Sequence, residues 1–496
     1  MNQIACKGMT HAPAGAVVGQ TRPYPMAGGV GTRSGSTTAA VAEPGHEQRG
    51  DQAGAAARTQ CTDEQRPPGQ PLHIFIVGGS GLIGSALAEH LVRSGHQVYL
   101  GVRDASAVRR GPADAHRISF QFPNPPGSAV GELLRGMDVV VNAAGIFRED
   151  STHSFDDVHV KGPCSLFELA AHAGVPRIIQ ISALGADLHA ATGYWRSKAC
   201  GDRCAWAFPG TAVVVRPSLV YAEEGASSLL FHRLAVLPWL PLPATTGDVQ
   251  PIHLTDLVEG LCHLVDCPDP PRLVAAVGPM RLSIDGYLQA LSSSNQRQCT
   301  ARIPLPLVLW LARWLPSGSV ANADALRMLA QPNTADPAPW RAVVGRPLRV
   351  PGQFVAPERR QQAQRNAVLA NLLPVLRLSI SLTWLVTAWV SAFAYPHAAS
   401  LDLLVRAQIP VAVAPVMLYL AALLDAALGL GMWIRRWRVG IYLAQIGLMV
   451  FYSVVVTLWL PEFWAHPYGP MIKNLPMLAL TVLLLWLEKP LGHRAG

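Results

Sequence analysis

The sequence contains little charge and very little lysine. Charged residues make up 15% of its 496 residues, apolar residues make up 50%, and only five positions are lysine. Arginine therefore carries most of the positive charge, either singly or in short clusters that flank apolar segments. A nucleic-acid-binding face needs a basic stripe along one surface, so the sequence predicts no nucleic-acid partner.

The eight cysteines lack the spacings that bind metals. None forms Cys-x-x-Cys or pairs with histidine at zinc-ligand spacing, so no metal site is predicted. Cys200 and Cys204 are four residues apart, on one face of a predicted helix, where thiols usually act as small buried side chains. We therefore expect reduced thiols in a cytosolic domain.

Residues 1–70 contain few large apolar side chains and no continuous apolar stretch of signal-peptide length. Such a segment cannot bury enough surface to offset the loss of chain entropy on folding. We expect a disordered extension over residues 1–70 and no export of the domain that follows.

Short β-branched runs then alternate with amphipathic segments. The runs cover residues 72–78, 97–103, 116–122, 138–143, 177–183, 211–216 and 272–277. This alternation predicts an α/β fold, a doubly wound parallel sheet of the Rossmann type. We expect the domain to span residues 71–350, with a smaller substrate lobe from about residue 279 and a linker over 351–370.

Four long apolar segments follow, at residues 371–394, 411–434, 439–460 and 474–487. The first three have the roughly 20 residues that cross a bilayer, and the fourth needs its flanks. They predict an all-α, four-helix transmembrane domain over residues 371–490.

Basic residues orient these predicted membrane helices. They are Arg359, Arg360 and Arg365 before the first, Arg435, Arg436 and Arg438 between the second and third, and Lys489 and Arg494 after the fourth. By the positive-inside rule, both termini and the α/β domain face the cytoplasm. We expect a multi-pass protein of the cytoplasmic (inner) membrane.

A glycine-rich turn follows the first predicted strand. The stretch VGGSGLIGSAL places three glycines between that strand and a helix. Glycines there let backbone N–H groups approach a pyrophosphate, which the positive end of the helix also attracts. The predicted cofactor contacts in this turn are Gly78, Ser80, Gly81, Leu82, Ile83 and Gly84.

The second predicted strand ends in VYLGVRD, with Arg103 where an NAD-specific site usually carries a carboxylate. A guanidinium suits the 2′-phosphate of NADP(H). We therefore expect NADP(H) to be preferred over NAD(H). Asp104 is adjacent, and a solvated Arg103 is the alternative.

The stretch GYWRSK places Tyr194 and Lys198 four residues apart, on one face of a predicted helix. With 10 tyrosines and five lysines in the chain, Tyr-x-x-x-Lys is expected by chance only roughly 0.1 times. A phenol beside an ammonium is a candidate for proton transfer.

Further motifs lie at strand ends: NAAG at 142–145, ISALGAD at 181–187, VRPSLVY at 215–221 and PIHLTDLVEGL at 251–261. With the glycine-rich turn and Tyr194-x-x-x-Lys198, they resemble the short-chain dehydrogenase/reductase superfamily over residues 72–350. The resemblance is to its extended and atypical branch, which includes proteins akin to the NADPH-binding accessory subunit of respiratory complex I. Residues 370–490 resemble a DoxX-like membrane domain.

The resemblance implies roles for these residues. Tyr194 would be the general acid or base, with its pKa lowered toward neutrality by the Lys198 ammonium, and Ser182 would hydrogen-bond the substrate oxygen. Lys198 would also hold the nicotinamide ribose. Further cofactor contacts are implied at Asn142, Ala143, Ala144, Gly145, Pro217 and Ser218. The aspartate that often contacts adenine is missing, which leaves Gln121 or Asn124 for that contact.

These features predict a membrane-anchored NAD(P)(H)-dependent oxidoreductase that acts on a lipophilic carbonyl, alcohol or quinone-like substrate. Two alternatives stay open: a non-catalytic NADPH-binding scaffold or assembly factor for a membrane complex, and an epimerase or dehydratase with tightly bound NAD. The lipid bilayer and a lipophilic small molecule are the expected partners, and the sequence names no protein partner.

Polar residues in the predicted membrane domain are also candidates for function. Asp425 lies near the middle of an apolar segment, where a charge is costly, and either forms an interhelical hydrogen bond or belongs to a functional site. His466, Lys473 and Asn474 line either a head-group or quinone pocket or a purely structural loop.

Overall fold

The computed structural model describes residues 70–104, 110–123, 127–292, 298–312, 323–465 and 471–488. The extension expected to be disordered lies outside these residues except for Gln70, and so do Asn124 and His466.

A seven-stranded sheet forms the centre of the α/β domain, and every strand pair in it is parallel. Its strands are β1 His73–Val77, β2 Gln97–Val102, β3 His116–Ser119, β4 Val139–Asn142, β5 Arg177–Ile181, β6 Thr211–Pro217 and β10 Leu273–Ala276. The strand order is β10-β6-β5-β4-β1-β2-β3. This confirms the predicted Rossmann-type sheet. The order reverses beside β1, where such sheets bind their ligands.

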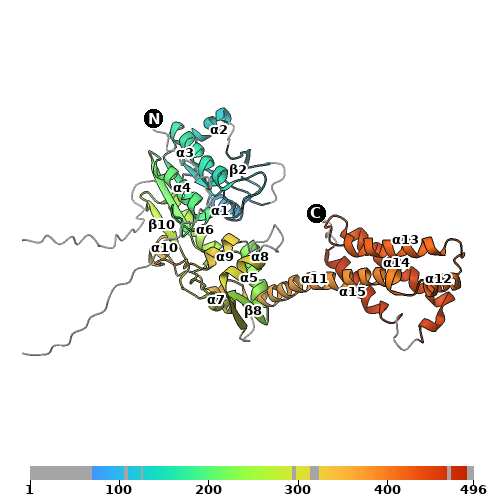
Figure 1. The fold of residues 1–496 in the computed structure, drawn as a ribbon. Coiled ribbons are helices and arrows are strands. Elements are labelled where there is room, and N and C mark those ends of the chain that lie inside the picture. Colours follow the sequence, from blue (N-terminus) through green and yellow to red (C-terminus); the bar gives the residue numbers. More distant parts are fainter. Residues whose placement is uncertain are drawn as a thin grey trace, which may run out of the picture. The chain divides into compact units, whose positions relative to one another are not determined.

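Helices cover both faces of the sheet, because strand residues alternate between two apolar cores. Ile74 and Ile76 pack with α1 (Leu82–Arg93), α6 (Leu254–Asp266) and α10 (Ala338–Val344). Phe75 and Val77 pack on the other side, where the helices are α2 Gly127–Leu134, α3 Gly162–His172, preceded by η1 Asp157–Lys161, and α4 Gly193–Trp206. Figure 1 shows these elements in blue to green, except α10, which comes later in the sequence and is drawn in yellow-orange.

A smaller lobe has its own apolar core, which includes Tyr221, Phe231, Tyr287 and Phe354. Its elements are β7 Val220–Tyr221, α5 Ala226–Ala235, β8 Trp239–Pro243, β9 Ile252–His253, α7 Ile284–Leu291, β11 Cys299–Ile303, α8 Leu305–Ala312, α9 Ala323–Leu329 and η2 Pro351–Gln353. The sequence predicts this lobe only from about residue 279, whereas α5 and β8 also belong to it.

The remaining helices, drawn in orange to red in Figure 1, form the predicted membrane domain. They are α11 Pro357–Trp389, η3 Val390–Ala394, α12 His397–Arg406, α13 Ala414–Gly431, α14 Arg438–Trp459, η4 Pro461–Phe463 and α15 Asn474–Glu488. Among the described residues, the three helices long and apolar enough to cross a membrane cover Pro357–Ala394, Ala414–Gly431 and Arg438–Trp459, whereas α15 is shorter.

Two features of this region differ from the sequence expectation. Helix α11 begins at Pro357, inside the predicted linker, because proline is well suited to the first helical position and the residues after it are good helix formers. Helix α12 lies in a stretch for which no element is predicted, since it is too short and too polar to register as a span.

Candidate functional site

The glycine-rich turn connects β1 to α1 and is packed against the end of β4. Gly78 has φ of 79°, and a Cβ atom at Gly78 would lie 2.7 Å from the amide nitrogen of Ala144. A Cβ atom at Gly84 would lie 2.3 Å from the carbonyl oxygen of Gly78. Only glycine therefore fits at these two positions. The turn leaves Ser80 and Gly81 exposed and Leu82 and Ile83 half-buried.

The first helix begins directly at this turn. Gly81 is its N-cap residue and supplies no side-chain hydrogen bond to the first-turn amides. The N–H groups at this end of α1 are thus suited to an anion such as a pyrophosphate, which the helix dipole also attracts. The predicted cofactor cradle is consistent with this geometry.

Arg103 follows β2, the strand beside β1, and is exposed. Its Nη1 lies 3.5 Å from Nε2 of His153, whose Nδ1 in turn lies 3.2 Å from the Asp150 carboxylate. A loop that follows β4 thus reaches the guanidinium. The spacing of His153 in the sequence does not reveal this contact, because Arg103 is fifty residues away.

The NAAG segment at the end of β4 joins the two halves of the site. Asn142 is fully buried, donates from Nδ2 to Gln180 Oε1 at 2.8 Å, and accepts at Oδ1 from the Ala144 amide at 3.2 Å. Asn142 therefore braces the ends of β4 and β5. Ala144 touches the glycine-rich turn, and a Cβ atom at Gly145 would lie 3.1 Å from Lys198 Nζ. Ala143 continues the strand ladder by donating to Val77.

Tyr194 and Lys198 lie in the first turns of α4. Thr192 caps this helix by accepting from the Trp195 amide at 3.4 Å. Lys198 is buried and donates from Nζ to the Ile181 carbonyl at 3.2 Å. Burial lowers the pKa of Lys198 to about 8. The two residues are held at the carboxyl end of β5, beside the NAAG segment.

The pKa of Tyr194 differs from the expectation. Aromatic rings surround the phenol at centroid distances of 5.0 Å for Phe147, 6.0 Å for Phe155 and 5.6 Å for His159. Burial among them raises the pKa of Tyr194 to about 12, whereas the sequence argument predicted a fall toward neutrality. The ammonium of Lys198 does not offset this burial, because it is itself desolvated and bonds the Ile181 carbonyl.

His159 connects the NAAG segment to α4, a role that the sequence did not predict. Its Nε2 accepts from the Ile146 amide at 3.0 Å, which assigns the proton to Nδ1. Nδ1 then donates to Ser197 Oγ at 2.9 Å, and Ser197 donates to the Tyr194 carbonyl at 2.8 Å. Burial, with a smaller effect from the charge of Lys198, lowers the pKa of His159 to about 2. His159 is thus a neutral brace.

Ser182 lies at the end of β5, and its hydroxyl faces the interior. Its Oγ is buried, and no atom in the described part of the chain is placed to form a well-aligned hydrogen bond with it. It interacts electrostatically with Asp202, whose pKa is raised by burial and whose Oδ2 accepts from Arg216 at 2.9 and 3.1 Å. The Ser182 hydroxyl therefore lies close to Asp202.

Pro217 and Ser218 end β6 and turn the chain toward the smaller lobe. Pro217 is buried and accepts at its carbonyl from the Leu184 amide. Ser218 donates from Oγ to the Gln250 carbonyl at 2.5 Å. Gln121, the described candidate for an adenine contact, is exposed after β3.

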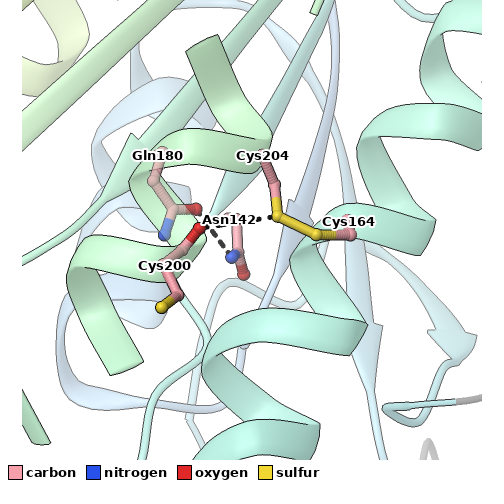
Figure 2. Close-up of a disulfide and its surroundings, with 5 residues drawn as sticks. All are labelled: Asn142, Cys164, Gln180, Cys200 and Cys204. Carbon is pink, nitrogen blue, oxygen red and sulfur yellow. Dashed lines mark hydrogen bonds between the residues drawn. A yellow bond between two sulfur atoms is a disulfide. The ribbon is translucent and has the colours of Figure 1, made fainter. Parts of the chain in front are cut away.

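A disulfide contradicts the expectation of reduced thiols in the α/β domain. Cys164 in α3 is bonded to Cys204 in α4, with their Cα atoms 5.0 Å apart (Figure 2). The two helices pack side by side on the sheet, so cysteines forty positions apart in the sequence become neighbours. Motifs of closely spaced cysteines do not reveal this pair, because its members are forty residues apart. Cys200 lies one turn before Cys204 in the same helix.

Comparisons with protein families match two separate parts of the chain. Residues 78–218 match an NAD(P)H-binding family, and residues 381–482 match the DoxX-like family. These are the regions in which the sequence predicted the cofactor domain and the membrane domain.

Individual relatives match the first part. Subunit 9 of the NADH dehydrogenase 1 alpha subcomplex of mouse mitochondria is 25% identical over 250 residues, 48% of this chain and 65% of that protein. A ceramide reductase of Caulobacter vibrioides is 30% identical over 201 residues, 39% of this chain and 61% of that protein. The chain thus spans less than two thirds of these relatives.

Among solved structures, a nucleoside-diphosphate-sugar epimerase from Staphylococcus aureus is 16% identical, with a TM-score of 0.48, over 57% of this chain and 99% of its own. The sheet topology and the glycine-rich turn agree with the NAD(P)H-binding match, and the apolar helices agree with the DoxX-like match. The chain contains an NAD(P)-binding Rossmann domain that resembles subunit 9 of respiratory complex I, followed by a C-terminal DoxX-like domain.

Proposed function

We propose that the protein is a membrane-anchored NAD(P)(H)-dependent oxidoreductase that acts on a lipophilic carbonyl, alcohol or quinone-like substrate. One observation carries the proposal: the NAAG segment contacts Gly78 through Ala144 and Lys198 through Gly145. These contacts support a single site in which a cofactor cradle and a Tyr-x-x-x-Lys pair lie together at the switch point of the sheet.

The residues divide the chemistry of carbonyl reduction between them. A bound nicotinamide supplies the hydride. Tyr194, with a pKa of about 12, holds its proton at neutral pH and donates it from Oη to the substrate oxygen. Lys198 holds the ribose side of the site and favours the phenolate that forms after transfer. The role of Ser182 as the partner of the substrate oxygen requires its hydroxyl to turn from Asp202 toward Tyr194.

The lipophilic substrate class is supported by two observations. The chain carries helices long and apolar enough to cross a membrane, and a DoxX-like domain fused to the cofactor domain. One relative is named for the reduction of a ceramide, a lipid. A membrane anchor is useful to an enzyme whose substrate partitions into the bilayer.

A scaffold is the second candidate function, because other relatives are named as subunits of complex I. Such a protein would retain its nucleotide without turnover. An epimerase or dehydratase would likewise keep a tightly held NAD. Whether the bound nucleotide exchanges with free nucleotide distinguishes these functions from that of a reductase.

We expect purified full-length protein to bind NADPH reversibly. A reductase must release NADP⁺ after each turnover, so gel filtration should leave most of the protein free of nucleotide, and titration should restore binding. The measurement is nucleotide content by chromatography before and after reloading. A nucleotide that stays bound through denaturant-free washing would favour the scaffold or the epimerase instead.

We further propose that the α/β domain and both termini face the cytoplasm. The support is the placement of Arg359 and Arg360 in the first turn of the first helix, of Arg435 and Arg436 between the next two helices, and of Arg438 at the start of the third. The Cys164–Cys204 disulfide argues the other way, since disulfides are rare in the cytosol.

A reporter whose signal depends on its side of the membrane therefore tests this topology. Fused after Gly496 it should read cytoplasmic, and inserted near Pro396, between two membrane helices, it should read on the opposite side. The reverse pattern would place the α/β domain outside, where the disulfide would be expected.

A further inference from the structure

Asp425 is a buried carboxyl in the middle of the membrane helix α13. Its side chain is 4% exposed, and Oδ1 has no hydrogen-bond partner in the described part of the chain. An interhelical hydrogen bond at this oxygen is therefore not formed. An unpartnered polar atom costs several kcal/mol in hydrocarbon, because no water is present to replace the missing partner.

Two more unpartnered atoms lie in the same layer of the helical bundle. Gln445 of α14 donates from Nε2 to the Leu428 carbonyl at 3.2 Å, which places it one turn from Asp425, and its Oε1 has no partner among the described residues. Gly429, four residues after Asp425, packs against Trp384 of α11, where a Cβ atom would lie 3.2 Å from the Trp384 Cβ. The Trp384 Nε1 is likewise buried and unpartnered.

The other buried side-chain nitrogen and oxygen atoms of the bundle that the structure describes have partners. Ser381 donates to the Gly429 carbonyl at 2.7 Å. Near the end of α15, Glu488 accepts from Arg377, Arg438 and Tyr442. The missing partners of Asp425, Gln445 and Trp384 are therefore a local feature of one layer. Together these three atoms present two acceptors and one donor.

A cavity of about 310 Å³ between α14 and α15 lies next to this layer. It is lined mainly by apolar side chains, which include Met449, Val450, Val454, Leu475 and Leu478. Met449 lines the cavity, is 3% exposed and belongs to the same core as Trp384 and Leu428, so the cavity and the polar layer share this core. Tyr452, one turn further along α14, interacts electrostatically with Asp425.

The volume of this cavity is within the range of small-molecule sites, which are mostly apolar with a few placed polar groups. Methionine is flexible and often lines adaptable sites. A ligand that occupies both the cavity and the polar layer would require the Met449 side chain to move.

We propose that the DoxX-like domain binds a long-chain alcohol or hydroxylated lipid, with the chain in the cavity and the hydroxyl at Asp425, Gln445 and Trp384. A hydroxyl group donates one hydrogen and accepts at its oxygen, so it can donate to one of the two acceptors and accept from the Trp384 N–H. A neutral head group also avoids the cost of a charge at this depth. The site is separate from the nucleotide site, and the proposal does not depend on turnover in the α/β domain.

Photo-crosslinking tests this site in the full-length protein in native membranes. The probe is hexadecanol that carries a diazirine and an alkyne, and labelled peptides are mapped by mass spectrometry. We expect labels on α13 and α14 that unlabelled hexadecanol displaces. Asp425→Leu removes the acceptor of the hydroxyl hydrogen and should reduce this labelling by about 10-fold, and Trp384→Phe, which deletes only the N–H, should reduce it by about threefold.

Two further variants show whether the loss of labelling is specific to a neutral hydroxyl at Asp425. Asp425→Asn keeps a neutral acceptor and should retain labelling to within about twofold, whereas a site for a cation would lose it. Thr383→Val is the matched control, because Thr383 is a polar residue of α11 that is exposed and bonds only within its own helix. Equal labelling of wild type and Asp425→Leu, loss of labelling in Asp425→Asn, or labels spread evenly over all exposed helix faces would each overturn the proposal.

Discussion

Replacement of Tyr194 by phenylalanine is expected to lower the kcat of NADPH-dependent reduction of a long-chain carbonyl by about 10²–10⁴-fold, because it removes the proton donor. The ring and its contacts with Phe147, Phe155 and His159 remain, so folding and NADPH affinity should be unchanged. The measurement is NADPH oxidation by purified protein, with thermal unfolding and a nucleotide titration on the same samples.

Lys198→Met is the informative companion variant. It removes both the charge that favours phenolate and the proposed ribose contact, so both kcat and NADPH affinity should fall. The Lys198 amine is buried beside Gly145, hence methionine can fill its volume. A Tyr194→Phe protein that keeps full turnover would remove Tyr194 from the mechanism.

Arg103→Asp should weaken NADPH binding by roughly 10–100-fold and leave NADH binding much less affected. The lost charge-assisted contact to a 2′-phosphate corresponds to about 1.5–3 kcal/mol. Arg103 is exposed at the end of β2 and bonds only weakly to His153, so the change should not disturb folding. Equilibrium titrations with both nucleotides provide the measurement.

Arg93→Asp is the matched control, since it makes the same charge change at the far end of α1. It should alter neither nucleotide by more than about twofold at moderate salt, because exposed charges are screened beyond about 10 Å. If Arg103→Asp weakened NADPH and NADH equally, the proposed preference for NADP(H) would be wrong.

The sheet could be predicted from the sequence because its central strands are buried on both faces and appear as short apolar runs. The edge strand β3 is largely exposed, and the structure places all seven strands in one parallel sheet. The elements that the sequence missed are short or depend on distant contacts. The two-residue strands β7 and β9 pair only with each other. Helix α5 packs with α7 in the core of the smaller lobe, although it precedes the predicted start of that lobe in the sequence.

In the candidate site too, features that depend on local sequence could be predicted, and those that depend on distant contacts could not. Gly78, Gly84, Tyr194 and Lys198 could be identified because backbone geometry and helical spacing are local properties. The brace formed by His159 could not, because it depends on a hydrogen bond to Ser197, thirty-eight residues away.

The directions of pKa shifts and the disulfide also depend on tertiary packing. The pKa of Tyr194 rises because rings from distant segments cover the phenol. The Cys164–Cys204 disulfide forms because α3 and α4 lie together on one face of the sheet. Neither environment is visible in the residues that flank these positions.

Complementation of a deletion strain tests most directly whether the protein acts as an enzyme, because it needs no knowledge of the substrate. The strain would receive wild type, Tyr194→Phe or Gly84→Val, with each protein confirmed in the membrane by blot. The valine places side-chain atoms against the Gly78 carbonyl and so blocks the nucleotide turn. We predict that wild type restores growth and that neither variant does. Full rescue by Tyr194→Phe beside failure of Gly84→Val would contradict catalysis and leave a nucleotide-binding scaffold.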